Sequence, residues 1–167
     1  PCISSAASDV YKRQVDDRAT ARGAAAQGAS RMKWHVVPAS RFAGHIEEWT
    51  RLHREGPASP LLAADFVLPL LEHFATGGEL LAICRQDGQT LAMAVLAPGG
   101  RARWQTFQPA QAPVGIWLQG PGLDSAALGA ALVRALPGFA LVLGLTQCDP
   151  ELYPRPVSYT HLRAHET

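Results

Sequence analysis

Apolar positions along the chain follow two different periods, and each change of period predicts a new element of secondary structure. KWHVVP at residues 33–38 is a short β-branched run ended by a proline, which predicts a strand. Residues 41–55 predict an amphipathic helix, with Ser40 as its N-cap and Gly56 just past its end. The apolar stripe of this helix recurs every three or four positions: Phe42, Ile46, Trp49 and Leu52.

Residues 64–75 predict a second helix, for which Asp65 is a candidate N-cap. Pro69 lacks the N–H that a helix interior needs, so it is tolerated only near the first turn. The pair Gly77-Gly78 then stops the helix.

The middle of the chain predicts antiparallel strands. Two apolar runs, at residues 79–86 and 90–98, are separated by the sequence DGQ. An Asp-Gly pair between apolar runs is a strong local signal for a hairpin. A third strand is predicted from the loosely alternating run at 101–108, and a short fourth one at 116–119.

The last third of the chain predicts a loop at residues 120–125, an alanine-rich helix at 125–136 and a final strand at 139–147. The final run, FALVLGLTQ, is continuously apolar, which predicts a strand buried on both faces. The whole order is strand, helix, helix, three or four antiparallel strands, loop, helix and strand. It predicts a mixed α/β (α+β) fold whose sheet is mostly antiparallel and flanked by helices.

The amino-acid sequence at the two ends of the chain differs in character from the sequence between them. One choice of codons for residues 9–14 gives DNA whose reverse complement, in another frame, encodes residues 157–161, so one DNA element read on both strands can account for both ends. Both ends resemble translated sequencing-adapter sequence, which predicts a metagenomic fragment of a longer protein. We expect four segments: adapter-like artefacts at 1–14 and 156–167, a disordered Ala/Gly/Arg-rich leader at 15–31, and one domain at 32–155.

Hydrophobic residues make up 47% of the 167-residue chain and charged residues 17%, which favours a globular domain. The net charge of +1 argues against a nucleic-acid or anionic-membrane partner. The longest apolar run is far shorter than the roughly 20 residues of a membrane span. Three scattered cysteines, Cys2, Cys84 and Cys148, predict neither a disulfide framework nor a zinc site, and a reducing, cytoplasmic location is the default expectation.

Few side chains suggest catalysis by their spacing. His45 and His53 lie eight positions apart, whereas a zinc-protease helix needs two histidines four apart. The adjacent Glu47 and Glu48 point to different sides of a helix and do not form an acid/base pair. Cys84 lies inside an apolar strand and is interpreted as a buried thiol. The sequence therefore predicts no metal site and assigns no catalytic residue.

Two further sets of side chains have open interpretations. Trp104, Phe107 and Trp117 lie in strand-like segments, where they predict core packing or, as the alternative, the lining of a substrate groove. Cys148 follows the last strand beside Asp149, where a thiol has better access to solvent than Cys84 has.

The stretch QGPGLDS, residues 119–125, lies between a predicted strand and a predicted helix. Glycines at such a place leave backbone N–H groups able to approach an anion, and the helix N-terminus adds a favourable dipole. Asp124 argues against a phosphate because its carboxylate would repel it. Asp124 or Ser125 is also a candidate N-cap, so a structural turn and an anion site both remain open.

The order of elements resembles that of the GNAT acyltransferase fold, in which two helices follow the first strand and an antiparallel meander, a pyrophosphate loop, a helix and a further strand follow. The family's loop pattern, Q/R-x-x-G-x-G/A, matches at Gln119 and Gly122 and departs at Asp124. Three stretches resemble sequences of the tandem-GNAT branch, which is related to cellulose-biosynthesis acetyltransferases and Fem-like transferases: EEWTRLH, LAICRQDGQTLAMAVL and RWQTFQPAQAPVGIW. The resemblance covers about residues 33–154.

This resemblance implies the N-terminal half of an N-acyltransferase that moves an acyl group from an acyl-CoA thioester to the amine of a small-molecule substrate. Its partner would be a second GNAT-like half of the same chain, and this half alone would be inactive. The alternative is a non-catalytic GNAT-like module for substrate binding or docking. By the resemblance, acetyl-CoA or another acyl-CoA would be the cofactor, and four residues of this half are candidates to hold it: Gln119, Gly120, Gly122 and Ser125.

Overall fold

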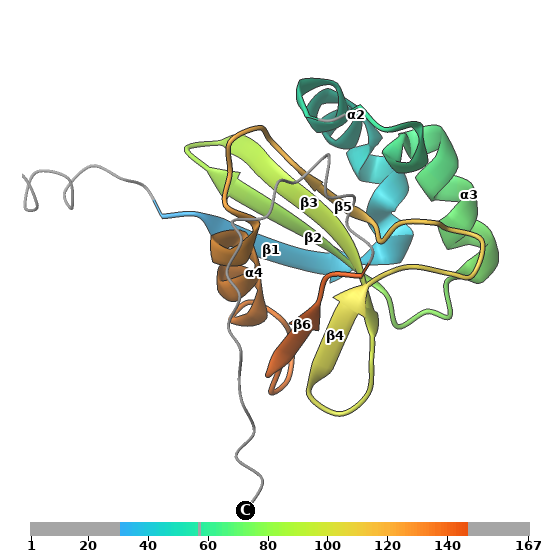
Figure 1. Ribbon diagram of the computed structural model, residues 1–167, viewed down its shortest axis with the longest axis vertical. Coiled ribbons are helices and arrows are strands. Elements are labelled where there is room, and N and C mark those ends of the chain that lie inside the picture. Colours follow the sequence, from blue (N-terminus) through green and yellow to red (C-terminus); the bar gives the residue numbers. More distant parts are fainter. Residues whose placement is uncertain (1–30, 57, 147–167) are drawn as a thin grey trace, which may run out of the picture. The chain divides into compact units, whose positions relative to one another are not determined.

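The computed structural model describes residues 31–56 and 58–146. The chain divides into two units, Pro1–Arg31 and Met32–Thr167, and every helix and strand given below belongs to the second. The predicted adapter-like ends, the leader up to residue 30, and Cys148 with Asp149 lie outside the described residues. The second unit has the predicted mixed α/β fold, with a mostly antiparallel sheet flanked by helices (Figure 1).

The described strands form one sheet in which β1, β2, β3, β4 and β6 are neighbours in that order, while β5 pairs with β3. Every pairing is antiparallel except that of β4 with β6, which run parallel. The strands are β1 (Lys33–Pro38), β2 (Leu80–Gln86), β3 (Gln89–Pro98), β4 (Arg103–Thr106), β5 (Trp117–Gln119) and β6 (Val142–Gly144). Because β4 and β5 pair with successive parts of β3, the predicted third and fourth strands share one edge of that strand.

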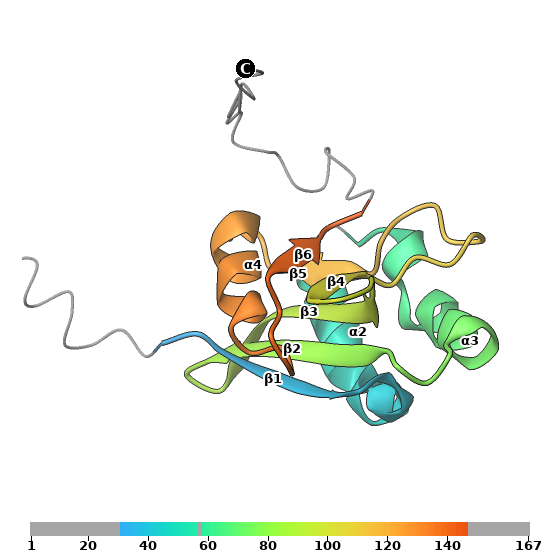
Figure 2. The same ribbon diagram turned by 90° about the horizontal axis from the view of Figure 1, so that it is seen from below.

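Helices cover both faces of the sheet, with α2 and α3 on one face and α4 on the other (Figure 2). The helical segments are η1 (Ala39–His45, a 3-10 helix), α2 (Ile46–Glu55), η2 (Pro60–Leu62, also 3-10), α3 (Ala64–Phe74) and α4 (Ser125–Val133). Alternate side chains of β2 serve two separate cores, because successive residues of a strand point to opposite faces. Leu81 and Ile83 pack under α2 and α3, whereas Ala82 and Cys84 pack under α4. None of the helices in the described part of the chain is long and apolar enough to cross a bilayer.

The predicted hairpin between β2 and β3 is confirmed. Asp87 and Gly88 both have positive φ, 52° and 79°, which is the backbone geometry of a two-residue type I′ turn. Gly88 adopts this conformation without steric cost, and Asp is one of the few other residues that tolerates it. The turn therefore sets the pairing of Gln86 with Gln89 beside it, and a β-bulge between Cys84 and Arg85 then shifts the register of the rest of β2 and β3.

The start of the first predicted helix is wrong. Residues 39–45 form the 3-10 helix η1, and the α-helix begins only at Ile46. Ser40 is not an N-cap but lies inside η1, which follows Pro38 without any side-chain cap. The Ala39 N–H donates to the carbonyl of Glu79, so the chain turns out of β1 directly at Pro38, before Ser40 can cap anything. The apolar stripe is confirmed, since Phe42, Trp49 and Leu52 are all buried.

The second predicted helix is confirmed, but not its cap. The N–H groups of Phe66 and Val67 both bond to the Ala63 carbonyl, so α3 starts at Ala64 and Asp65 falls in its first turn. There the charge of Asp65 still favours the helix dipole. Pro69 lies inside the helix, beyond the first turn and on its exposed side.

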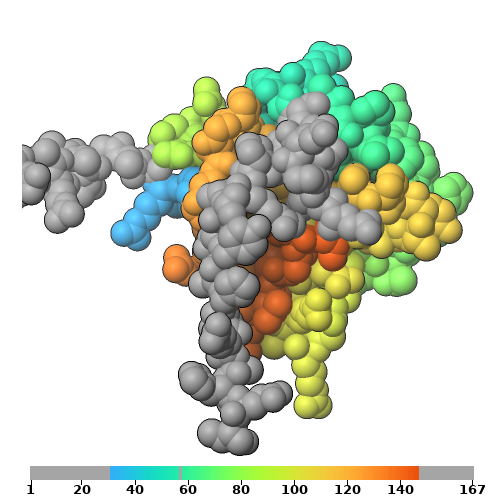
Figure 3. All heavy atoms as spheres, in the orientation of Figure 1, coloured from blue at the N-terminus to red at the C-terminus, as the bar shows by residue number. Residues whose placement is uncertain are grey.

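The prediction that the last strand is buried on both faces is wrong. Strand β6 lies at the end of the strand order, with β4 as its partner, and Val142 is 51% exposed. Phe139 and Leu141, just before the strand, are 79% and 62% exposed. A continuous apolar run predicts burial on both faces only if other elements cover both of them. Among the described residues, β6 has β4 as its one strand partner, Leu143 and Leu145 pack partly buried on the α4 side, and part of the β6 segment is visible at the surface (Figure 3).

Candidate functional site

The loop at residues 120–125, predicted to be either a structural turn or an anion site, joins β5 to α4 and closes around the side chain of Gln119, which is 4% exposed. The Oε1 atom of Gln119 accepts hydrogen bonds from Trp117 Nε1 and Ser125 Oγ, each at 2.8 Å. Its Nε2 atom donates to the Leu123 carbonyl at 2.9 Å. The amide is therefore used within the protein, where it ties the strand, the loop and the first residue of the helix together.

Backbone and charged groups of the same loop are also engaged. The Gly120 N–H donates to the Leu91 carbonyl of β3 at 2.9 Å. The Asp124 carboxylate accepts from the Ala126 N–H at 2.9 Å, which confirms Asp124 as the N-cap and leaves Ser125 as the first helical residue. Gly122 has a φ of +73°, which few residues other than glycine adopt. Asp124 thus occupies the position at the helix N-terminus that an anion would take.

The structure brings together all four candidate cofactor residues, but their arrangement does not fit a pyrophosphate. The Gln119 amide, the Ser125 hydroxyl and the Gly120 N–H all have partners inside the protein. The Asp124 carboxylate adds a negative charge beside the backbone N–H groups, and a like charge there repels phosphate. Binding of acyl-CoA by Gln119, Gly120, Gly122 and Ser125 therefore stays a prediction without geometric support.

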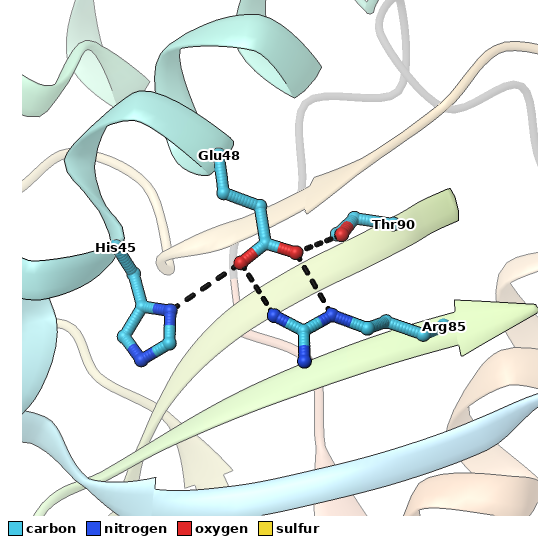
Figure 4. Close-up of polar contacts among 4 residues, drawn as sticks. All are labelled: His45, Glu48, Arg85 and Thr90. Atoms are coloured by element: carbon cyan, nitrogen blue, oxygen red, sulfur yellow. Dashed lines mark hydrogen bonds and ion pairs between the residues drawn. The ribbon is translucent and has the colours of Figure 1, made fainter. Parts of the chain in front are cut away.

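A second polar group lies on the opposite face of the sheet, where Glu48 of α2 meets the end of the β2–β3 hairpin (Figure 4). Arg85 Nε and Nη2 donate to the two Glu48 carboxylate oxygens at 3.0 and 2.7 Å, a bidentate ion pair. The Thr90 hydroxyl donates to the same carboxylate, and His45 Nδ1 lies 3.3 Å from Glu48 Oε2. This cluster was not predicted from the sequence.

Glu48 is held in its charged form. Burial disfavours the carboxylate charge, but hydrogen bonds from Arg85, Thr90 and His45, together with the charge of Arg85, outweigh it and lower the pKa of Glu48 from 4.5 to about 2. The same pair raises the pKa of Arg85. A carboxylate with four donors and a pKa this low is a poor proton acceptor near neutral pH. The cluster therefore fastens α2 to the hairpin rather than serving as a base.

We expect acid to weaken the fold through Glu48. Because its pKa is lowered on folding, its contribution is complete above pH 4.5 and is lost as the pH falls toward 2. At about 1.4 kcal/mol for each pH unit of lowering, the ceiling is roughly 3 kcal/mol. Arg85 is 38% exposed, so solvent screening reduces this, and we expect about 1–2 kcal/mol.

Urea unfolding at pH 5 and pH 2.5 measures this contribution. Glu48→Gln should remove that part of the acid dependence, while the exposed neighbour Glu47→Gln should keep it. An equal acid dependence in all three proteins would contradict the assignment.

The other residues considered for chemistry are structural. Cys84 is buried, and burial raises the pKa of its thiol to about 11, which confirms the interpretation as an inert thiol. Phe107 and Trp117 are buried in the two cores, which confirms core packing, and Trp104 packs partly buried against the second core. His53 Nε2 lies 2.7 Å from the Ser59 carbonyl. Among residues 31–56 and 58–146, no group of three or more His, Cys, Asp or Glu is placed to hold a metal ion.

Comparisons with known proteins add little to this geometry. No protein-family model matches the chain, and no curated protein matches it. A solved GCN5-related N-acetyltransferase from Ralstonia eutropha is similar over 82% of this chain and 98% of its own, with 19% sequence identity and a TM-score of 0.36. A likeness this distant assigns neither a fold family nor an activity to the chain.

Proposed function

We propose that residues 32–155 are the N-terminal half of a GNAT-like N-acyltransferase. The parent protein would transfer an acyl group from an acyl-CoA thioester to the amine of a small molecule. One observation carries the proposal. Two α-helices, α2 and α3, separate β1 from β2, an antiparallel β2–β3–β4 arrangement follows, and a Gln119-x-x-Gly122 loop leads from β5 into the N-terminus of α4. This is the order, with the loop in the same place, that the resemblance to GNAT acyltransferases implies.

Within the parent, we propose that this half has no catalytic role of its own. Its loop is closed by Gln119 and capped by Asp124, so the donors that would hold an acyl-CoA are directed inward. The carboxylate of Glu48 is saturated with donors, and the thiol of Cys84 is buried. The second half of the same chain would then bind the acyl donor, while this half acts as scaffold. The alternative function, a non-catalytic GNAT-like module for substrate binding or docking, shares this absence of a catalytic role.

Calorimetric titration of this chain with acetyl-CoA tests the proposed role of the loop. We expect no saturable heat and no thermal shift at about 1 mM ligand, because binding would have to break the hydrogen bonds of Gln119 and leave buried polar groups unpaired. Asp124→Asn is the matched variant, since Asn also caps helices but carries no charge. It should also fail to bind. Saturable binding by the wild-type chain would overturn the scaffold role, and binding by Asp124→Asn alone would show that charge, not loop closure, prevents it.

The activity itself is tested on the longer protein. The reading frame should be extended beyond residue 155, and the product assayed for acyl transfer from acetyl-CoA to a panel of primary amines. A second strand–loop–helix with an intact Q/R-x-x-G-x-G/A loop and measurable transfer would support the enzyme. An extension without such a loop and without transfer would leave the docking module as the better function.

A further inference from the structure

A groove of about 400 Å³ opens between η1, α3 and the segment that leads into β2. This volume falls within the range of small-molecule sites in proteins. Its apolar lining includes Phe42 and Leu71, which are buried, and Leu68, which is partly buried. Helix α3, which lines the groove, lies on the same face of the sheet as α2, the face opposite α4 (Figure 2). The groove is therefore remote from the Gln119 loop, which packs on the α4 face.

A buried carboxylate, Glu79, lines the groove although the residue is only 5% exposed. It accepts hydrogen bonds from the Thr76 N–H at 2.9 and 3.0 Å, the Thr76 hydroxyl at 2.9 Å and the Gly77 N–H at 2.8 Å. Burial by itself would raise the pKa of Glu79, but these hydrogen bonds outweigh it and the pKa is lowered. The negative charge is thus retained at neutral pH. Neither of the ion pairs found among the described residues involves Glu79.

The remaining lining residues reinforce this negative character. Glu72 of α3 is exposed and brings a second carboxylate to the groove, and the hydroxyl-bearing Ser40 also lines it. Among the described residues that line the groove there is no lysine, arginine or histidine. A charge at the wall of a partly desolvated groove acts on a ligand more strongly than the same charge in open water. An apolar surface with two carboxylates and no basic side chain selects for a cation with an apolar body.

We propose that this groove binds a small amphipathic amine. Its aromatic or hydrocarbon body would lie on Phe42, Leu68 and Leu71, and its ammonium group would face Glu79 and Glu72. The proposal does not rest on acyl transfer, because the site uses neither the loop nor α4. It gives this half of the protein a ligand of its own.

Titration with 4-phenylbutylamine, followed by calorimetry and by amide chemical shifts, tests the site. We expect saturable binding with a Kd on the order of 0.1–1 mM, typical for a ligand of this size. The neutral isostere 4-phenylbutanol and the anion 4-phenylbutyrate should each bind at least about tenfold more weakly, because both lack the charge that Glu79 and Glu72 attract. Shifts should be concentrated on η1, α3 and residues 75–79. Equal affinity for the amine and the alcohol, or no binding of the amine, would overturn the proposal.

Variants at the rim avoid the risk that loss of Glu79 unfolds the protein. Glu72→Gln should weaken amine binding about three- to tenfold through the loss of one partly screened charge. Ala43→Phe, at an exposed lining position, should fill the groove and weaken the amine and the alcohol alike. Glu47→Gln is the matched control, since it removes an exposed carboxylate that does not line this groove. Glu47→Gln should keep wild-type affinity, and if Glu72→Gln and Ala43→Phe also bound the amine with wild-type affinity, the ligand would lie elsewhere and the site would be refuted.

Discussion

Replacement of Trp49 by alanine should cost about 3–5 kcal/mol of unfolding free energy, the range found for deletion of a large buried aromatic side chain. Trp49 of α2 is fully buried, and its ring meets Phe42 edge-on at a centroid distance of 5.1 Å. Its Nε1 donates to the Leu62 carbonyl at 2.7 Å, which ties α2 to η2. The alanine variant loses the packing, the ring pair and this hydrogen bond together. Since a domain of this size has only about 5–15 kcal/mol to lose, much of the variant would be unfolded at 37 °C.

Two further variants separate the contribution of the Trp49 hydrogen bond from that of its packing. Trp49→Phe keeps much of the apolar volume but leaves the Leu62 carbonyl without its donor, so it should cost about 1–3 kcal/mol. Glu47→Ala on the exposed side of the same helix should stay within about 0.5 kcal/mol of the wild type. Urea unfolding, followed by circular dichroism, gives all three values. A loss below about 1 kcal/mol for Trp49→Ala would mean that α2 does not pack on the sheet as described.

The parts of the fold that could be predicted from the sequence are those determined by neighbours along the chain. The hairpin at Asp87 and Gly88 is determined by two residues whose backbone preferences are strong, and the hairpin was predicted correctly. The stripe of Phe42, Trp49 and Leu52 was predicted from its period alone, because one face of α2 has to be buried.

Predictions failed where a distant segment decides the outcome. Ser40 looked like an N-cap, but the Ala39 N–H donates to the Glu79 carbonyl, forty residues away along the chain, and η1 begins at Ala39, two residues before the predicted start of the helix. The run that became β6 is as apolar as a central strand. Whether such a run is buried depends on what lies beside it in the sheet, and hydrophobic periodicity contains no information about that.

The same reasoning applies to the candidate sites. Glu48 and Arg85 are separated by 37 positions, and their pairing depends on the register of the hairpin beneath α2. Within the sequence, the cluster is indicated locally by His45 and Glu48, since residues three positions apart in a helix are neighbours on its surface. In the Gln119 loop, residue type left Asp124 and Ser125 as alternative caps, and it did not predict the inward turn of the Gln119 amide. That orientation depends on Trp117 and Ser125 as its partners.

Gly115 lies where β4, β5 and the continuation of β6 meet, and its replacement by alanine should be the second severe change. A Cβ at Gly115 would lie 2.3 Å from Thr106 Oγ1 and 2.4 Å from the Thr146 carbonyl oxygen. These atoms have little room to move. Thr106 Oγ1 bonds to the hydroxyl and to the N–H of Thr146, and the Gly115 N–H donates to the Thr146 carbonyl. An added methyl group therefore has to separate β6 from β4, and we expect a cost of about 2–3 kcal/mol, as for an overpacked core.

Gly129 of α4 provides the opposite case in the same chain. A Cβ there meets only Leu143 Cδ2, at an ordinary 3.8 Å, so Gly129→Ala should stabilise the protein by about 0.5–1 kcal/mol through its helix propensity. Urea unfolding of the two glycine-to-alanine variants compares them directly, with the fluorescence of the four tryptophans of the chain as the readout. Because β5 leads from Gly115 into the Gln119 loop, Gly115→Ala should also shift the amide signals of residues 117–125, whereas a purely local clash would leave them unchanged. A destabilisation below about 0.5 kcal/mol for Gly115→Ala would show that the three strands do not converge at this residue.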